Sequence, residues 1–327
     1  MSKRAGEETV YHGQTNCQYC SDTEGNQCIR PAYFELDGWA LCGHHADINH
    51  RKPLPRDSSV KRRKLESLAQ HRQTVETARV DNQAAGLVGN VACQKMAMMR
   101  EVVAQPGYLH VYPNNKHQGR QDGLGCAALS PMRLGPVHHR QPGLPAARNI
   151  ENMHQFSKVW PCEVDSDGAP SHAWRKKRLA GYLDPEPHRH KFSAREMTKH
   201  RAAVGGKNRN APLYAVYQTL QGGEERRFSY RESRYFYCKA YEALATQTDD
   251  FRRLQELRAQ GTNLLICGYD AYPVTQSLYD HYCDESRAFG HELVLYTLLS
   301  MADSALYPWN MYRANHPDLY EGVAHVV

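Results

Sequence analysis

The chain of 327 residues is long enough for two domains, and its hydrophobic fraction of 41%, with twenty Tyr, can form a sizeable core. A run of about 18 apolar residues, which a membrane span requires, is absent, and the first residues lack the apolar stretch of a secretory signal. We therefore expect an intracellular protein without a membrane partner. Ten Cys in such a protein indicate reduced thiols or metal ligands rather than disulfides.

The net charge of +6 is unevenly distributed along the chain. Residues 101–210 have a net charge of +8 and hold nine of the eighteen His, whereas residues 211–327 have a net charge of −5. A basic, His-rich centre suggests an anionic ligand such as a phosphate or a nucleotide. A solvated basic surface would explain the same charges equally well.

Cysteines and histidines gather near the N-terminus in two short pairs, each separated by two residues. Such pairs are typical of a tetrahedral structural Zn²⁺ site. The sequence AYFELDGWALC between them predicts a hairpin that turns at Asp37-Gly38 and brings the pairs together. Residues 1–50 are therefore predicted to be a zinc-binding module, in which Cys28 and His44 are alternative ligands. The expected zinc ligands are Cys17, Cys20, Cys42 and His45.

Residues 51–104 are predicted to be a linker followed by a basic helix. The linker is KPLPRD, from Lys52 to Asp57, and Ser58 or Ser59 can cap the helix. The basic run at residues 61–64 either faces solvent or contacts phosphates.

Residues 105–148 are dense in Gly, Pro and Asn, yet they also carry apolar residues such as Tyr112, Leu129 and Leu134. We predict short strands and ordered loops that wrap over a core. Loops of this kind often carry binding residues.

The sequence NIENMHQFSKV, residues 149–159, is predicted to be a helix with two distinct faces. Glu151, Gln155 and Lys158 stand at i, i+4 and i+7 on one face. A separate apolar stripe can anchor the helix to a core. That stripe consists of Ile150, Met153, Phe156 and Val159.

The remaining chain alternates helical and strand patterns. A basic helix is predicted over residues 171–183, and a hairpin is predicted around Gly222-Gly223. Two helices should follow, the second starting at an Asp249 or Asp250 cap. Next come a buried strand over residues 263–270 and a final apolar helix over residues 290–301.

The pattern Glu151-x3-Gln155-x2-Lys158 resembles the signature helix of the NADAR (YbiA-like) family. The order of FRRLQELRAQGTNLLICGYD and FGHELVLYTLL is also similar to a later part of that family. The resemblance implies a mainly helical α+β domain over residues 105–327. It also implies an N-glycosidase that acts on ADP-ribosylated or nucleotide-derived compounds, so the expected partner is an ADP-ribose-type ligand.

Cleavage of a ribose C–N bond passes through an oxocarbenium-like state, which needs a carboxylate and a proton route to the leaving nitrogen. Glu151 is the expected catalytic carboxylate, and Asp270, at the end of a predicted strand, is a second candidate. Amide and cationic side chains would hold phosphates or ribose hydroxyls. The candidates for substrate binding are Gln155, Lys158, His188, Arg189, His190 and Lys191.

The order of a zinc hairpin followed by GYLHVYPNNKHQGR is also similar to proteins of large nucleocytoplasmic DNA viruses. The alternative hypothesis is therefore a non-enzymatic, zinc-bearing viral protein of the virion or the host cytoplasm, such as a virion component or a nucleic-acid-binding factor. This hypothesis requires a continuous basic face across residues 61–64 and 175–178. The enzyme hypothesis requires Glu151 to lie in a cleft.

Overall fold

The computed structural model describes residues 58–96, 105–116, 118–188 and 212–326, with side chains from Glu66 onward, and the backbone of three earlier strands. The chain divides into two compact units, Met1–Gln70 and His71–Val327.

The first unit contains a small antiparallel sheet in the order β2-β1-β3. Strands β1 (Phe34–Leu36) and β2 (Trp39–Leu41) pair so that Leu36 faces Trp39. This antiparallel pairing of two strands adjacent in the sequence confirms the predicted hairpin. Strand β3 (Lys52–Pro53) pairs with β1, so the start of the predicted linker is in fact part of this sheet.

A parallel four-stranded sheet is the centre of the second unit, in the order β4-β10-β5-β6. Its strands are β4 (Val91–Lys95), β5 (Tyr108–Tyr112), β6 (Gly123–Gly125) and β10 (Asn263–Gly268). All neighbouring strands run in the same direction. Every residue of β10 is buried, as expected for a strand covered on both faces, and the predicted buried strand is confirmed.

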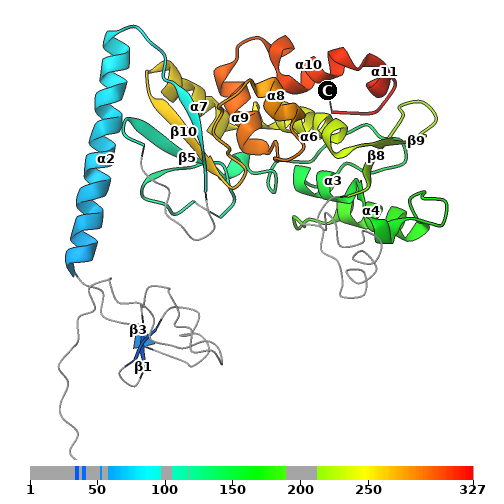
Figure 1. Cartoon of the computed structure of the whole chain (residues 1–327), viewed down its shortest axis with the longest axis horizontal. Coiled ribbons are helices and arrows are strands. Elements are labelled where there is room, and N and C mark those ends of the chain that lie inside the picture. Colours follow the sequence, from blue (N-terminus) through cyan, green and yellow to red (C-terminus); the bar gives the residue numbers. More distant parts are fainter. Residues whose placement is uncertain are drawn as a thin grey trace, which may run out of the picture. The chain divides into compact units, whose positions relative to one another are not determined.

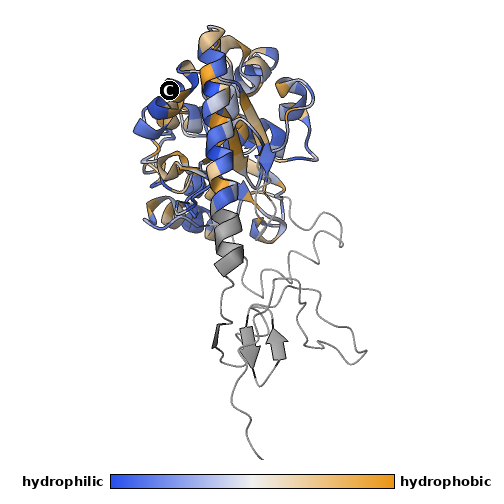
Figure 2. Cartoon of the chain, turned by 90° about the vertical axis from the view of Figure 1, so that its left-hand side faces the viewer, coloured by the Kyte–Doolittle hydropathy of each residue, from blue (hydrophilic) through white to orange (hydrophobic). Residues whose placement is uncertain are grey.

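Helix α2 spans Ser58–Ala84, and its part from His71 onward covers the face of the sheet that carries His110 and Tyr112. The backbone N–H of Gly107 donates to Thr74 Oγ1 at 3.3 Å, and Asn82 Nδ2 donates to the carbonyl of Gly261 at 2.7 Å. Figure 2 shows this largely hydrophilic helix in front of the sheet. A small core lies on the same face and contains Met96, Tyr112, Leu265 and Cys267.

The main core lies on the opposite face of the sheet, where Val111, Leu264 and Ile266 point. Helices α6 (Tyr230–Ala245), α7 (Asp249–Ala259) and α9 (His291–Ser300) contribute to it. Thr248, rather than Asp249 or Asp250, caps α7 by accepting from the N–H of Phe251.

Further helical elements follow α9, so the prediction that α9 is the final helix is wrong. They are 3-10 helix η3 (Ser304–Leu306), α10 (Pro308–Asn315) and α11 (Pro317–Tyr320). Together with α8 (Leu278–Cys283), helices α10 and α11 gather beside α6 (Figure 1).

A second, antiparallel sheet has the order β7-β8-β9 and holds the central helix in place. It consists of β7 (Lys158–Val159), β8 (Tyr214–Gln218) and β9 (Glu225–Phe228). Gly222 and Gly223, both with positive φ, form the turn between β8 and β9 and confirm that hairpin. Beside this sheet lie α3 (Ile150–Phe156) and α4 (His172–Leu183) (Figure 1). The 3-10 helix η2 (Pro161–Glu163) follows β7, whereas the 3-10 helix η1 (Ala127–Leu129) contacts α7.

The described part of the second unit is thus an α+β fold, as predicted. Within the described ranges, no helix combines the length and the apolar character that a bilayer crossing would need.

Candidate functional site

Helix α3 begins at Asn149, whose side chain accepts from the N–H of Asn152 at 2.8 Å. Two residues of the predicted apolar stripe, Ile150 and Met153, are buried and anchor the helix, whereas Val159, also buried, belongs to β7. Phe156 packs against Gly181 of α4 so closely that a β-carbon at residue 181 would lie 2.3 Å from its ring.

Lys158 does not lie on this helix, which corrects the predicted helical spacing of Glu151, Gln155 and Lys158. The helix ends at Phe156, because Ser157 forms the C-cap and its hydroxyl donates to the carbonyl of Met153 at 2.7 Å. Lys158 then pairs with Ala215 as the first residue of β7.

The three side chains nevertheless meet as a row. Gln155 Nε2 donates to Glu151 Oε1 at 2.9 Å, and Lys158 Nζ lies 3.5 Å from Gln155 Oε1. All three side chains are partly buried rather than exposed. We call Glu151, Gln155 and Lys158 the α3 row.

Burial changes the proton affinity of the groups around the α3 row. It lowers the pKa of Lys158 to about 8, against the opposing effect of the Glu151 carboxylate. The pKa of His154 is lowered by burial and then by the positive charge of Lys158. The pKa of Tyr237, whose ring lies 4.8 Å from that of His154, is raised by burial and then by the charges of Glu151 and Glu292.

The loop before α3 contacts the N-terminus of this helix through its backbone. The N–H of Glu151 donates to the carbonyl of Pro131 at 3.0 Å, and that of Ile150 donates to Leu134 at 2.9 Å. Gly135 permits this close contact, since a β-carbon there would lie 2.1 Å from the carbonyl oxygen of Arg148. The ordered course of residues 129–145 thus brings backbone to the N-terminus of α3.

Asp270, the second predicted carboxylate, lies just beyond the carboxyl end of β10. It is partly buried and flanks Gly290, where a β-carbon would lie 2.8 Å from Asp270 Cβ. The same β-carbon would lie 2.9 Å from Oε2 of Glu292, a residue of α9 that is only 1% exposed. Asp270 and Glu292 are therefore neighbours across Gly290.

Sequence reasoning did not select Glu292, Tyr237 or His154 as site residues. One signal was available for Glu292, because it is the only acidic residue in the otherwise apolar sequence HELVLYTLLS. A charged residue in an apolar helix is rarely buried without a reason. Tyr237 and His154 gave no such signal, since an aromatic residue in a helix is ordinarily a core residue.

His188 is the only described member of the predicted cationic string, and it is exposed. Its Nε2 lies 2.8 Å from Asp184 Oδ2, and its N–H donates to Asn152 Oδ1, so it ties the end of α4 to α3. Several other predicted residues lie outside the described ranges. They are Arg189, His190, Lys191 and the predicted or alternative zinc ligands Cys17, Cys20, Cys28, Cys42, His44 and His45.

The predicted basic helix is α4, and three of its four adjacent cations have partners within the protein. Arg175 forms a two-pronged ion pair with Glu225, at 2.9 and 2.7 Å. Lys177 Nζ lies 2.9 Å from Glu163 Oε1. Arg178 is 2% exposed and donates to Gln141 Oε1 at 2.6 Å and to the carbonyl of Val216 at 3.0 Å. The fourth of these cations, Lys176, is exposed and forms no ion pair with any described residue.

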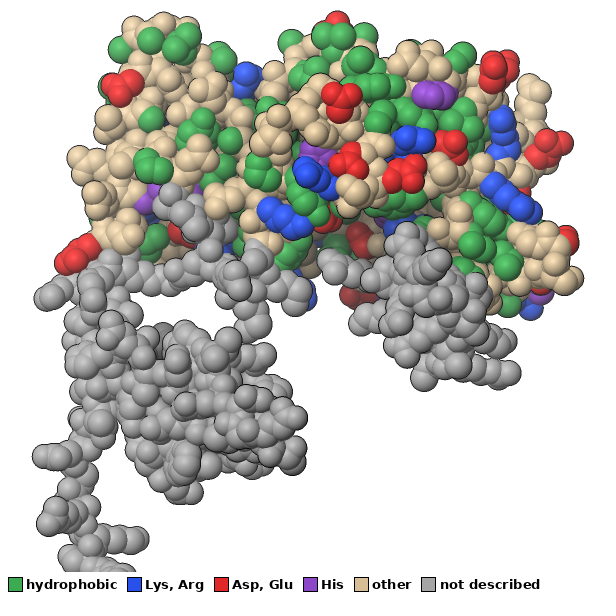
Figure 3. Space-filling model, viewed as in Figure 1, with side chains coloured by type: hydrophobic (Ala, Val, Ile, Leu, Met, Phe, Trp, Pro, Cys, Tyr) green, Lys and Arg blue, Asp and Glu red, His purple; other side chains and the backbone are tan. Residues whose placement is uncertain are grey.

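Within α4, three of these cations are therefore engaged with the protein itself. The side chains of residues 61–64 lie outside the described residues, so the nucleic-acid hypothesis stays a prediction. On the face shown in Figure 3, acidic and basic side chains stand next to one another rather than in a patch of one sign.

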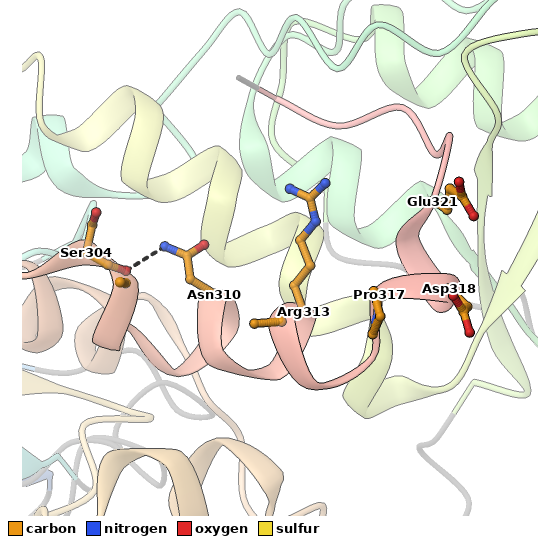
Figure 4. Close-up of a pocket in the computed structure, with 8 residues that line it drawn as sticks. Ser304, Asn310, Arg313, Pro317, Asp318 and Glu321 are labelled. Atoms are coloured by element: carbon orange, nitrogen blue, oxygen red, sulfur yellow. Dashed lines mark hydrogen bonds between the residues drawn. The ribbon is translucent and has the colours of Figure 1, made fainter.

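Two surface hollows lie away from the α3 row. The larger, of about 680 Å³, is lined by Asn310, Arg313, Asp318 and Glu321 of the C-terminal helices and the residues after them (Figure 4). Arg313 is engaged with the hydroxyl of Tyr235 at 2.9 Å. The second hollow lies between Glu242, Leu298 and Tyr307. Neither brings together the groups that the predicted chemistry needs.

The described residues contain no group of three or more His, Cys, Asp or Glu side chains placed to hold a metal ion. Comparisons with protein families, with functionally described proteins and with solved structures give no match to this chain. The resemblance to NADAR proteins thus rests on the sequence patterns alone and stays a prediction.

Proposed function

We propose that the α3 row is the centre of an N-glycosidase site that cleaves a ribose C–N bond in ADP-ribosylated or nucleotide-derived compounds. The observation that supports this proposal most directly is the contact between a partly buried carboxylate, Glu151, and the amide of Gln155, beside the buried amine of Lys158. Partly desolvated charges in contact are typical of functional sites.

In the proposed reaction, the bond between ribose C1 and the nitrogen breaks, and its electron pair leaves with the nitrogen. The positive charge that develops on the ribose is stabilised by the carboxylate of Glu151, which also takes a proton from the attacking water. The leaving nitrogen then takes up this proton, so that the products are the free base and a ribose with a hydroxyl at C1, and Glu151 is again a carboxylate. Gln155 holds that carboxylate in position through its hydrogen bond. Lys158, as a cation, binds a phosphate or hydroxyl oxygen of the substrate.

The test is incubation of the full-length protein with ADP-ribosylated nucleosides and nucleic acid, followed by mass spectrometry for released ADP-ribose and free base. Glu151→Gln should reduce the rate of product formation by about a hundred- to ten-thousandfold. Glu256→Gln is the matched control, because Glu256 is an exposed carboxylate on α7. A folded wild-type protein that releases no product from any of these compounds would exclude the proposed activity.

We also propose that the N-terminal module holds one structural Zn²⁺ through Cys17, Cys20, Cys42 and His45. The β1–β2 hairpin supports this proposal, since it lies between the two ligand pairs and reverses the chain between them. Elemental analysis of protein purified in reducing buffer should find about one zinc per chain. Protein without zinc would contradict the proposal, and Cys42→Ser should lower the zinc content.

A further inference from the structure

Glu292 is a buried carboxylate that lacks a full set of partners. It is 1% exposed, and its Oε2 accepts no hydrogen bond from any described residue. His291 Nδ1 lies 3.1 Å from this oxygen, in a contact without hydrogen-bond geometry. A buried charge of this kind is costly, so its presence at one particular place calls for an explanation.

The backbone around Glu292 is shaped to admit this side chain. A β-carbon at Gly268, the last residue of β10, would lie 1.9 Å from Glu292 Oε1. A β-carbon at Gly290 would lie 2.9 Å from Glu292 Oε2 and 3.4 Å from Asp270 Oδ2. The two carboxylates therefore flank a stretch of backbone that carries no side chain.

The position of this pair in the fold is one where ligands are commonly bound. Open parallel sheets bind ligands beyond the carboxyl ends of their strands, and Asp270 follows the carboxyl end of β10 directly. Gly290 is the N-cap of α9 and offers no side chain that would block an approaching ligand. Asp270 is partly exposed and would be reached first, with Glu292 directly behind it.

We propose that Asp270 and Glu292 together bind the vicinal diol of a ribose, an inference that rests on the proposed nucleotide-type substrate. Two neighbouring hydroxyls supply two donors, and two carboxylates supply the acceptors. One hydroxyl donates to Asp270, and the other gives Glu292 Oε2 the partner that it lacks. This assigns Glu292 to substrate binding and places the ribose between the carboxyl edge of the parallel sheet and the α3 row.

The experiment measures binding of ADP-ribose and of its analogues lacking the 2- or the 3-hydroxyl of the terminal ribose, by calorimetry on the full-length protein. The wild type should bind each deoxy analogue roughly ten- to a hundredfold more weakly than ADP-ribose, as expected for loss of a hydrogen bond to a charged group. Glu292→Gln and Asp270→Asn should weaken binding of ADP-ribose and reduce this discrimination. Glu256→Gln should change neither.

The thermal unfolding of the same variants separates binding from structure. Glu292→Gln removes a buried charge and should keep or raise Tm while it weakens binding. If Glu292→Gln had a lower Tm and still distinguished ADP-ribose from its deoxy analogues as the wild type does, Glu292 would be a structural residue and the proposal would be overturned. Equal binding of ADP-ribose and both deoxy analogues by the wild type would overturn it as well.

Failure of this inference can be distinguished from failure of the proposed activity. Product release from ADP-ribosylated compounds without discrimination of the deoxy analogues would overturn the diol site and leave the glycosidase activity. If the wild type bound ADP-ribose more tightly than its deoxy analogues but released no product, the diol site would be supported and the catalytic role of the α3 row would be refuted. A wild type that binds no ADP-ribose would overturn both.

Discussion

The α3 row and the cations of α4 were selected from the sequence on the same grounds, since both place charged residues close together on a predicted helix. In the structure they differ. Arg175, Lys177 and Arg178 are paired or buried within the protein. Glu151 and Lys158 are partly buried and joined through a neutral amide. A pattern of charges in the sequence therefore shows where charged residues lie on an element. Only their partners in the structure show whether those residues stabilise the fold or are able to bind a ligand.

The largest expected effect separates the two regions by activity. Glu151→Gln should reduce glycosidase turnover by about a hundred- to ten-thousandfold, because it removes the carboxylate that stabilises the developing charge. Its Tm should remain close to that of the wild type. Lys176→Ala in α4 should leave turnover unchanged, and equal losses in both variants would erase the distinction between the two regions.

The next effect concerns stability and should appear only in α4. Arg178→Ala should lower the free energy of unfolding by about 2–4 kcal/mol, because Gln141 and the carbonyl of Val216 lose a buried, charged donor. Urea unfolding monitored by circular dichroism measures this change. Lys176→Ala is the exposed control, and a comparable loss in that variant would refute the structural role assigned to Arg178.

Lys158 of the α3 row should make the free energy of unfolding depend on pH. Burial lowers the pKa of Lys158 from 10.5 to about 8, so the unfolded chain binds more protons between these two pH values. The free energy of unfolding should therefore gain about 1–3 kcal/mol from this residue as pH rises through that window. Between pH 7.5 and 10, urea titrations should show the free energy of unfolding of the wild type rising by this amount relative to that of Lys158→Met. The buried thiols and phenols, whose pKa values are raised by burial, titrate alike in both proteins and cancel in this difference.

The smallest effect is expected for an exposed ion pair of α4. Arg175→Ala should lower the free energy of unfolding by about 0.2–1 kcal/mol, since exposed pairs are weak and are screened by salt. The difference from the wild type should shrink in 0.5 M NaCl. A difference that persisted at high salt would mean that Arg175 acts through its bond to the carbonyl of Pro170 instead.

Local patterns predicted the elements of this fold well, because hydrophobic periodicity and turn residues act over short distances. The buried strand β10, the β8–β9 hairpin and the anchored face of α3 all follow from such patterns. The end of α3 did not, because Ser157 and the pairing of Lys158 with Ala215 depend on a strand more than fifty residues away.

The site was predictable only in part, for a related reason. Glu151 and Asp270 could be selected by residue type and by their places at the ends of elements. Glu292 could not be selected in this way, because its burial depends on the missing side chains of Gly268 in β10 and of Gly290. Thr248 shows the same limit at α7, where three consecutive residues could each have capped the helix.

The order of strands in the parallel sheet has a consequence for biosynthesis. Strand β10 lies between β4 and β5, although at least 150 residues separate it from either in the chain. Until the ribosome has released residue 268, β4 has no neighbour to pair with, and β5 can pair only with β6. Folding of this unit must therefore await most of its own translation, and contacts of such sequence separation form slowly. A chain truncated before β10 should be retained by chaperones or degraded, whereas the full-length chain should reach the folded state.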